Sequence, residues 1–542
     1  MSALDLTARG LARRAISETA GLQAELAGPG GSPAIGHRRS EAQAILEPVS
    51  AILARLDMSP AGFGALHDPQ VSDASALQAF TTALGAAGGG LVRLEPKVHS
   101  FGQSDQHEKL LWDQSNAGLI GAGIDRTIIR NVHPSASYSM GLGDCHNALF
   151  SDITFHGRMG KFTAQSLRGI IFNRCKFTTH PDQVINAVQI TTDFMTDGAE
   201  YIYFIDCIFE NAGRMNCEIT NHGAGTTVRY ANIFFIRPRF TGAGQANPVV
   251  GMGLSLSGRG DHVQINSPVF DGNQLIQLEN AGCSRLLVKD AVIRAATLPS
   301  GKAPVSFSNT IPMHDCEVEG LRLVGERLGD LAARPTMDKA FYIESCKRLK
   351  LARISAAIDK TDTAEHVIEM GNSGKTCSDV TVENCDLWSN SNKPLISFLN
   401  CEGHMLVRNN TLVSEASART AALLACYGSA TAHVSGNRFS WTSGAATTVV
   451  MKTGSAALSV APDNPGLVTR YRGTVTVASG STTSPLVNHG LPGMPTFMRA
   501  YPLGNSGAAW PTVHTSGTQI RANIPASLGA SVNIALEAEY AF

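Results

Sequence analysis

Five copies of one six-residue phrase decide the fold: FSDITF (150–155), FNRCKF (172–177), FIDCIF (204–209), FIRPRF (235–240) and INSPVF (265–270). In each copy a large apolar residue is followed, three and five residues later, by a small or apolar residue and a phenylalanine. The final phenylalanines, from Phe155 to Phe270, are 22, 32, 31 and 30 residues apart. Repetition at a period of roughly 20–50 residues is typical of repeat architectures.

Weaker copies of the phrase extend the series. They end at Ile293, Leu323, Ala356, Leu387, Leu412 and Phe439, which brings the total to eleven. Each copy is a short alternating run bounded by Gly, Asn, Asp or Pro, which is the pattern of a strand with alternate side chains buried. A second phrase, such as Val188-x-Ile190, Cys217-x-Ile219 or Ile276-x-Leu278, supplies a further strand. Asn410 and Asn437 repeat in one column, which predicts a side-chain ladder. Parallel strands stacked about 4.8 Å apart then give about eleven coils in a rod about 50 Å long.

The composition fits a turn-rich β protein of several domains. The chain has 542 residues, 53 glycines, 16% charged residues and a formal net charge of −1. This balance favours neither nucleic acid nor a membrane surface as a partner. No apolar run approaches the roughly 18–20 residues that span a bilayer, and no signal-peptide core follows the first charged residues. We therefore expect synthesis in a cytoplasm.

The eleven cysteines contain no CxxC pair. Cys175, Cys207 and Cys385 fall in one inward column of the repeat, so we interpret them as small core residues. Disulfides or a metal site are the alternatives.

Three segments differ in character. Residues 1–60 are predicted to form a helical attachment or neck segment, ended in part by the glycines at 28–31. Residues 61–465 hold a capping helix through Gly85, with Leu77, Phe80 and Leu84 on one face, followed by the repeat. Residues 466–542 alternate as short strands and turns, which predicts a small β-sandwich that serves trimerisation or glycan binding.

Two quoted stretches carry a resemblance to a known family. GFGALHDPQVSDASALQAFTTALGAAGGGLVRLEP (62–96) resembles the N-terminal capping segment of pectate-lyase-like right-handed β-helix proteins. This segment differs from the usual family pattern at His67-Asp68-Pro69, where the family usually has Gly-Asp. GSPAIGHRRSEAQAILEPVSAILARLDM (31–58) looks like the neck of bacteriophage tailspikes. The resemblance covers roughly residues 30–440.

The resemblance implies an all-β right-handed parallel β-helix and a phage tailspike function. Such a protein binds host cell-surface polysaccharide and depolymerises it, here as an endo-glycosidase. It implies a homotrimer attached through its N-terminus to the baseplate or tail, made in the host cytoplasm and acting at the bacterial surface. A non-catalytic receptor-binding or structural tail protein is the first alternative, and a polysaccharide lyase is the second.

Glycoside hydrolysis needs two carboxyl groups, about 5–5.5 Å apart for retention or about 6.5–9.5 Å for inversion. Carboxylates in one outward column, one or two coils apart, have roughly that spacing. Glu210 and Asp271 form one such pair with Thr241 between them, and Glu218 and Glu279 form another.

Other candidates lie near these pairs in sequence. The candidate catalytic set is completed by Asp261, and the candidate substrate-binding residues are Arg214, His222, Arg259 and Arg285. Arginine suits acidic sugars because its fork matches a carboxylate. Glu344 is expected to continue the Glu279 column. We expect no cofactor and no metal ligands, because no Asp cluster of adjacent coils stands out.

Overall fold

The structure is a computed structural model that describes residues 59–539. Within that range the description excludes residues 69, 106, 136–137, 162–165, 194, 222–227, 295–297, 300, 309–310, 325–335, 360–365, 373, 417–421, 442–448, 453–454, 461–463, 465–469, 489–494, 496, 504–510, 517–518 and 526–530. The predicted helical neck lies almost entirely outside the described residues, so its prediction stays untested.

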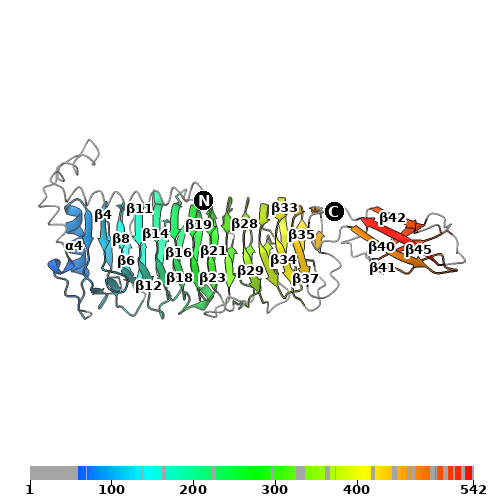
Figure 1. Ribbon diagram of the computed structural model, residues 1–542. Helices are drawn as coiled ribbons and strands as arrows, with labels where there is room; N and C mark the ends of the chain where they lie inside the picture. Colours follow the sequence, from blue (N-terminus) through cyan, green and yellow to red (C-terminus); the bar gives the residue numbers. More distant parts are fainter. Residues whose placement is uncertain are drawn as a thin grey trace, which may run out of the picture.

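The chain winds into a parallel β-helix with three short strands per coil (Figure 1). One strand of each coil belongs to a 13-stranded parallel sheet. Its strands are β2 (Val98–Phe101), β5 (Ile128–Asn131), β9 (Thr154–His156), β12 (Lys176–Thr178), β15 (Ile208–Glu210), β18 (Arg239–Thr241), β20 (Val269–Asp271), β23 (Val292–Arg294), β26 (Arg322–Val324), β29 (Ser355–Ile358), β32 (Asp386–Ser389), β34 (Thr411–Ser414) and β37 (Arg438–Trp441). The predicted β-helix is therefore confirmed, and β2 and β5 precede the first of the eleven phrases.

The phrases lie in register from coil to coil. Their final residues occupy one inward column, which runs His99, Ile129, Phe155, Phe177, Phe209, Phe240, Phe270, Ile293, Leu323, Ala356, Leu387, Leu412 and Phe439. Consecutive phenylalanine rings stack with centroids 4.7–5.4 Å apart. Each repeat in the sequence thus corresponds to one coil, and each coil adds one residue to this column along the axis of the β-helix.

The other strands of the coils form a 26-stranded sheet, because some strands continue around one corner. The two longest are β19 (Leu254–Asn266) and β33 (Ile396–Arg408). The rest are β1 (Gly90–Arg93), β3 (Leu110–Trp112), β4 (Ala117–Ile120), β6 (Tyr138–Leu142), β7 (Cys145–His146), β8 (Leu149–Ser151), β10 (Arg158–Lys161), β11 (Ser166–Asn173), β13 (Val188–Thr191), β14 (Gly198–Ile205), β16 (Cys217–Asn221), β17 (Tyr230–Ile236), β21 (Leu278–Ser284), β22 (Leu287–Lys289), β24 (Val305–Phe307), β25 (Glu317–Glu319), β27 (Phe341–Ile343), β28 (Lys350–Ala352), β30 (Ile368–Met370), β31 (Cys377–Glu383), β35 (Leu424–Gly428), β36 (Thr431–Ser435), β38 (Val450–Lys452) and β39 (Ala457–Val460).

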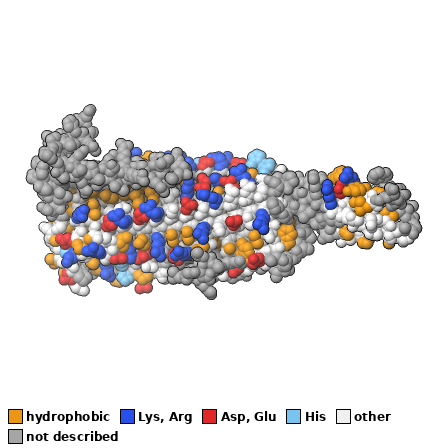
Figure 2. All heavy atoms as spheres, in the orientation of Figure 1, with side chains coloured by type: hydrophobic (Ala, Val, Ile, Leu, Met, Phe, Trp, Pro, Cys, Tyr) orange, Lys and Arg blue, Asp and Glu red, His pale blue; other side chains and the backbone are white. Residues whose placement is uncertain are grey.

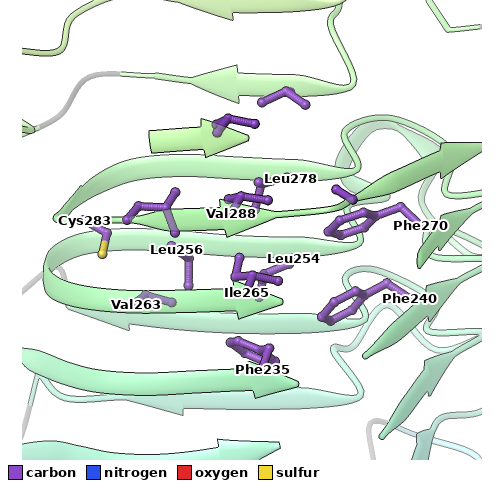
Figure 3. Close-up of a cluster of buried hydrophobic side chains, with 14 of the residues drawn as sticks. Phe235, Phe240, Leu254, Leu256, Val263, Ile265, Phe270, Leu278, Cys283 and Val288 are labelled. Atoms are coloured by element: carbon purple, nitrogen blue, oxygen red, sulfur yellow. The ribbon is translucent and has the colours of Figure 1, made fainter. Parts of the chain in front are cut away.

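One apolar core fills the inside of the coils from the cap to Leu458. Figure 3 shows a section of it, in which Phe235, Phe240 and Phe270 point inward from neighbouring coils. All eleven cysteines are buried free thiols, which confirms their interpretation as core residues. Charged side chains of both signs are interspersed over the outer face of the rod (Figure 2).

The N-terminal end of the core is covered by a short 3-10 helix, η1 (Pro60–Phe63), and by α4 (Ala74–Ala86). Leu77, Phe80 and Leu84 are fully buried, as the helical spacing predicts. Asp73 is the N-cap residue of α4, yet its side chain makes no capping hydrogen bond to the helix. Its carboxylate accepts instead from the backbone of Leu66 at 2.8 Å.

Left-handed residues form one corner of many coils. Arg174 (φ 48°) and Arg237 (φ 51°) are examples at the corner before the 13-stranded sheet. Each guanidinium makes two hydrogen bonds of 2.6–2.7 Å to the aspartate at that corner of the preceding coil, Asp152 or Asp206. A left-handed backbone costs a residue with a Cβ about 1–2 kcal/mol, and these bidentate pairs offset part of that cost.

An amide ladder closes the C-terminal coils. The side chain of Asn410 donates to Asn437 at 2.8 Å, and that of Asn437 donates to Asn464 at 3.0 Å. The predicted ladder of Asn410 and Asn437 is therefore confirmed and has a third member.

The last described segment is a small antiparallel β-sandwich with its own core, as predicted. One sheet orders β40 (Arg470–Val477), β45 (Val532–Glu539) and β42 (Phe497–Pro502), and the other orders β41 (Val487–Asn488), β44 (Gln519–Asn523) and β43 (Thr512–Ser516). Among the described residues, no helix has the length and apolar character needed to cross a bilayer.

Candidate functional site

A groove of about 450 Å³ lies at the corner where β19 turns from one face of the β-helix to the next. It is lined by Arg229, Arg259, Gly260, Asp261, Gly282, Ser284, Arg285, Ile311, Pro312 and His314. Three of these, Arg259, Asp261 and Arg285, are candidates from the sequence. The lining carries three arginines against one aspartate, so the groove is electropositive.

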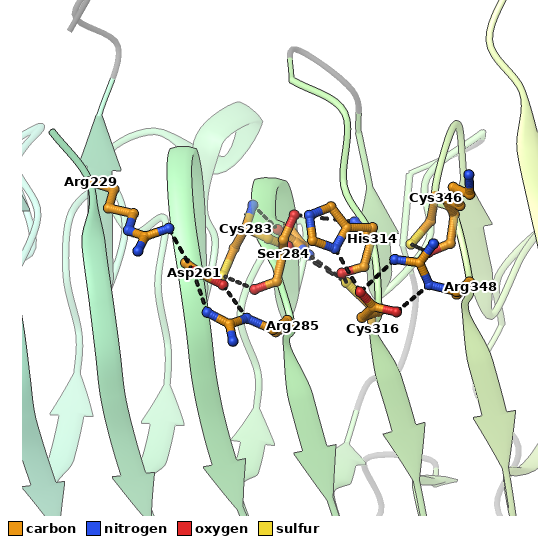
Figure 4. Close-up of polar contacts among 12 residues, drawn as sticks. Arg229, Asp261, Cys283, Ser284, Arg285, His314, Cys316, Cys346 and Arg348 are labelled. Atoms are coloured by element: carbon orange, nitrogen blue, oxygen red, sulfur yellow. Dashed lines mark hydrogen bonds and ion pairs between the residues drawn. The ribbon is translucent and has the colours of Figure 1, made fainter. Parts of the chain in front are cut away.

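Asp261 organises the groove by holding two arginines (Figure 4). Nη1 of Arg229, from the preceding coil, donates to Asp261 at 2.8 Å. Arg285, from the following coil, donates to both oxygens of the same carboxylate, with Nε at 2.6 Å from Oδ1. The Asp261 side chain is 10% exposed, whereas those of Arg229 and Arg285 are 56% and 53% exposed. The two guanidiniums are thus fixed in place and still open to a ligand.

Electrostatics keeps this carboxylate charged. Burial opposes ionisation of Asp261, but hydrogen bonds from Arg285 and the charges of Arg285 and Arg229 outweigh it and lower the pKa of Asp261. The pKa of Arg285 is correspondingly raised by the same hydrogen bonds. At neutral pH the three side chains are a fixed charge cluster with a net positive charge.

Two glycines make this corner possible. Gly258 (φ 74°) and Gly282 (φ 138°) are left-handed, and a Cβ on either would collide with the backbone of the neighbouring coil. Their absence of side chains lets β19 and β21 approach closely as they turn. This close approach sets Asp261 in register with Ser284 of the next coil and Ala231 of the previous one.

An aromatic ledge, made of Tyr203, Phe234 and His262 from three consecutive coils, begins at the residue after Asp261. The rings of Tyr203 and Phe234 stack with centroids 4.8 Å apart, and His262 meets Phe234 edge-on at 5.8 Å. Nδ1 of His262 lies 2.6 Å from Oδ1 of Asn232, which fixes the ring. All three ledge residues are partly exposed. Flat rings of this kind offer apolar contact to a ligand while their polar edges stay wet.

The carboxylate columns have the register predicted from the sequence. Glu218 pairs with Ser255, which pairs with Glu279, so the two glutamates lie two coils apart. Oε2 of Glu279 accepts from Ser255 at 2.7 Å. Glu218 is 7% exposed, and its Oε2 accepts from the amides of Asn186 and Gln189 at 2.7 and 2.9 Å.

The second pair lies on a different face, the 13-stranded sheet. Glu210 is in register with Thr241 and Asp271, again two coils apart. Lys176 Nζ lies 2.7 Å from Glu210, and Arg294 lies 3.5 Å from Asp271. Since both carboxylates are engaged by cations on their own sheet, this pair is a surface ion-pair network, separate from the groove.

The remaining predicted residues have mixed outcomes. Arg214 lies in the turn before β16 and does not line the groove, and His222 lies outside the described residues. The placement of Glu344 in the Glu279 column was wrong, because Tyr342 occupies that position two coils on. The structural register, not the count of residues, decides which side chains share a column.

Sequence reasoning missed Arg229 and His314 of the groove. Arg229 stands two residues before Ala231, which is in register with Asp261, but only the coil alignment reveals this. His314 comes from a turn between β24 and β25, and such turns vary in length from coil to coil.

Comparison with known proteins gives similarity at the level of the fold. No protein-family profile and no curated protein matches the chain. Among solved structures, the chain is similar to the tailspike gp49 of Pseudomonas phage LKA1, with 12% identity and a TM-score of 0.45, covering 90% of this chain and 100% of that one.

Two further solved structures are similar. A mutant tailspike of E. coli bacteriophage HK620, in complex with a pentasaccharide, has 13% identity and a TM-score of 0.44, with 96% and 100% coverage. PfbA, a surface adhesin of Streptococcus pneumoniae, has 11% identity and a TM-score of 0.40, with 74% and 93% coverage. The assignment of the fold rests on the strand register described above.

Proposed function

We propose that the protein is a tailspike-type polysaccharide-binding protein that takes an acidic polysaccharide in the Arg229–Asp261–Arg285 groove and cleaves it as an endo-glycosidase. The observation that carries the proposal is the pair of exposed guanidiniums held in place by one shielded carboxylate. A guanidinium fork binds a carboxylate in a bidentate manner, so a uronic or other acidic sugar fits it.

The surroundings of the groove support a polymer as ligand. The aromatic ledge extends the candidate surface over three consecutive coils, from His262, the residue after Asp261, to Phe234 and Tyr203. Two strand spacings correspond to about 9.6 Å. On the other side of the corner, Glu279 precedes Gly282, which lines the groove. A polysaccharide laid over the corner is a ligand that can contact the ledge, the groove and Glu279 together.

Glu218 and Glu279 are the proposed carboxyl pair for cleavage. Their backbones are separated by two strand spacings, about 9.6 Å, which is close to the separation used by inverting glycosidases. In such a mechanism one carboxyl group protonates the leaving oxygen while the other activates a water molecule. Ser255 lies between them and donates to Glu279.

Binding without cleavage is the second candidate function. The observation that favours it is the shielding of Glu218, a residue that is 7% exposed and whose carboxylate accepts hydrogen bonds from two amides. Under this alternative, Glu218 is a structural residue and the groove alone carries the function.

Product analysis separates the candidates. Purified protein is incubated with acidic surface polysaccharides from bacteria, and new reducing ends, ultraviolet-absorbing unsaturated ends and bound polymer are measured. Reducing ends without unsaturation, lost in Glu279→Gln with binding retained, support hydrolysis. Unsaturated ends indicate a lyase, and binding without new ends supports the second candidate. No binding to any polymer contradicts the proposal as a whole.

The proposed tailspike function leads to further expectations about assembly and location. We expect a homotrimer attached to a phage tail or baseplate through residues 1–60, made in the host cytoplasm and acting at the bacterial cell surface. The native mass of the full chain tests the trimer. Labelling of phage particles with an antibody against the chain tests its place in the virion.

A further inference from the structure

Three side chains meet beneath the cap of the β-helix, far along the chain from the groove. His67 comes from the turn after η1, Asp73 is the N-cap residue of α4, and His99 lies on β2. Their potential ligand atoms all lie within 4.8 Å of one another. His99 is also the first member of the inward column that continues as Ile129 and Phe155. A polar residue therefore stands where every later coil has an apolar one.

Several polar atoms of these side chains lack hydrogen-bond partners. His99 is 0% exposed and Asp73 is 1% exposed, whereas the His67 side chain is 13% exposed. Both ring nitrogens of His99, Nδ1 of His67 and Oδ2 of Asp73 are buried atoms without a hydrogen bond. Each buried polar atom left unsatisfied costs about 1–3 kcal/mol. One atom from each residue can be directed at a common point, which indicates a missing common partner that accepts their lone pairs.

We propose that His67, Asp73 and His99 bind a divalent transition-metal ion, with Zn²⁺ as the best match, and that this ion fastens the cap to the first coil. Two imidazoles and one carboxylate are ligands that Zn²⁺ favours. Asp73 and His99 are almost completely buried at the end of the core, so we assign the ion a structural role there.

The distances suit an ion with a small closing movement. Nδ1 of His67 lies 3.9 Å from Oδ2 of Asp73. Around a tetrahedral ion, bonds of about 2.1 Å place donor atoms about 3.4 Å apart, so these two atoms approach each other by about half an ångström. The other donors, which lie within 4.8 Å of one another, approach by at most about 1.4 Å. Nε2 of His67 faces the carboxylate of Glu95 at 3.2 Å. A carboxylate behind the second ring nitrogen is the usual support of a metal-bound histidine.

The local backbone shows how these side chains reach the site. His67 is left-handed, with φ 56°, a conformation that glycine adopts without steric cost. A histidine there accepts backbone strain and brings its imidazole beneath the cap. Asp73 likewise gives up its capping hydrogen bond to α4 and turns its carboxylate to the same point.

The test measures metal content and stability of the full-length protein, without reference to polysaccharide. The protein is stripped with a chelator, equilibrated with Zn²⁺, desalted and analysed for bound metal, and its thermal unfolding is followed with and without Zn²⁺. We expect one tightly held Zn²⁺ per chain and a thermal midpoint that falls by several degrees on stripping and recovers on addition of Zn²⁺.

The informative variant is His67→Gly, because glycine relieves the left-handed strain and the variant should fold. We expect its Zn²⁺ affinity to fall on the order of a hundredfold or more, while its metal-free form unfolds at or above the temperature of the metal-free parent. His107→Gln, at an exposed histidine, should retain the metal. Equal Zn²⁺ content in the parent protein and in His67→Gly would overturn the proposal. So would a thermal midpoint of the parent protein that is the same with and without Zn²⁺.

Discussion

The stacked phenylalanines should stabilise the β-helix through nearest-neighbour contacts alone. Phe209 and Phe240 are fully buried, and their rings stack at 4.7 Å with an interplanar angle of 16°. Replacing either by leucine removes the stack but keeps most of the apolar volume. We expect each single variant to lose about 1–2 kcal/mol, below the 3–5 kcal/mol typical of Phe→Ala.

The double variant gives the decisive number. Stacking of an aromatic pair contributes about 0.5–1.5 kcal/mol beyond the burial of the two rings. Each single variant loses this stacking energy, and the double variant loses it only once. Phe209→Leu with Phe240→Leu should therefore lose about 0.5–1.5 kcal/mol less than the sum of the single losses. The control pair is Phe155 with Phe240, three coils or about 14 Å apart, for which losses should add within about 0.5 kcal/mol.

Guanidinium titrations of the three single and two double leucine variants measure these free energies of unfolding. The reasoning is refuted if the adjacent pair is additive, or if the distant pair couples as strongly as the adjacent one. Either result would mean that the column transmits strain along the axis instead of acting through neighbouring rings.

Three further outcomes are expected. Asp261→Asn leaves two arginines uncompensated, so acidic polysaccharide should bind several-fold more tightly at low salt and lose affinity more steeply as salt rises, measured by calorimetry at two ionic strengths. Burial, with the charges of Arg130, His180 and Lys176, lowers the pKa of His156 from 6.5 to about 4. As pH falls, His156 is therefore protonated in the unfolded state before it is protonated in the folded state. The free energy of unfolding should fall by on the order of 2–3 kcal/mol between about pH 6.5 and about pH 4. His156→Gln should remove this pH dependence. Asp206→Ala should cost more in melting temperature than Arg237→Gly, because only the former leaves a left-handed arginine without its partner.

The inner architecture was predictable because burial repeats. Every coil must present an apolar residue to the same column, so Phe155, Phe177 and Phe209 recur in a recognisable phrase. The outward-facing carboxylate pairs could also be predicted, since Glu218 and Glu279 lie the same number of residues after the column residue of their own coils. The second phrase was misplaced by two residues at Ile276-x-Leu278, because Leu278 takes the position of Leu254 while Ile276 joins a small outer cluster.

The groove was not predictable in full because it is made at a corner. Corner residues are set by turn lengths and by glycines such as Gly258 and Gly282, which no period encodes. Arg229 and Arg285 reach Asp261 from opposite sides only because three coils turn in step there. The metal-ligand set was missed for a similar reason: His67 and His99 are 32 residues apart and belong to no shared motif.

The burial of the cysteines has a consequence for the way the protein responds to oxidants. Burial raises the pKa of the Cys145, Cys175 and Cys385 thiols to about 12. Thiolate, the form that oxidants attack, is therefore scarce at these positions at neutral pH, and solvent does not reach them. Because all eleven cysteines are buried free thiols, the described fold contains no disulfide, and refolding from the reduced chain needs no oxidative step.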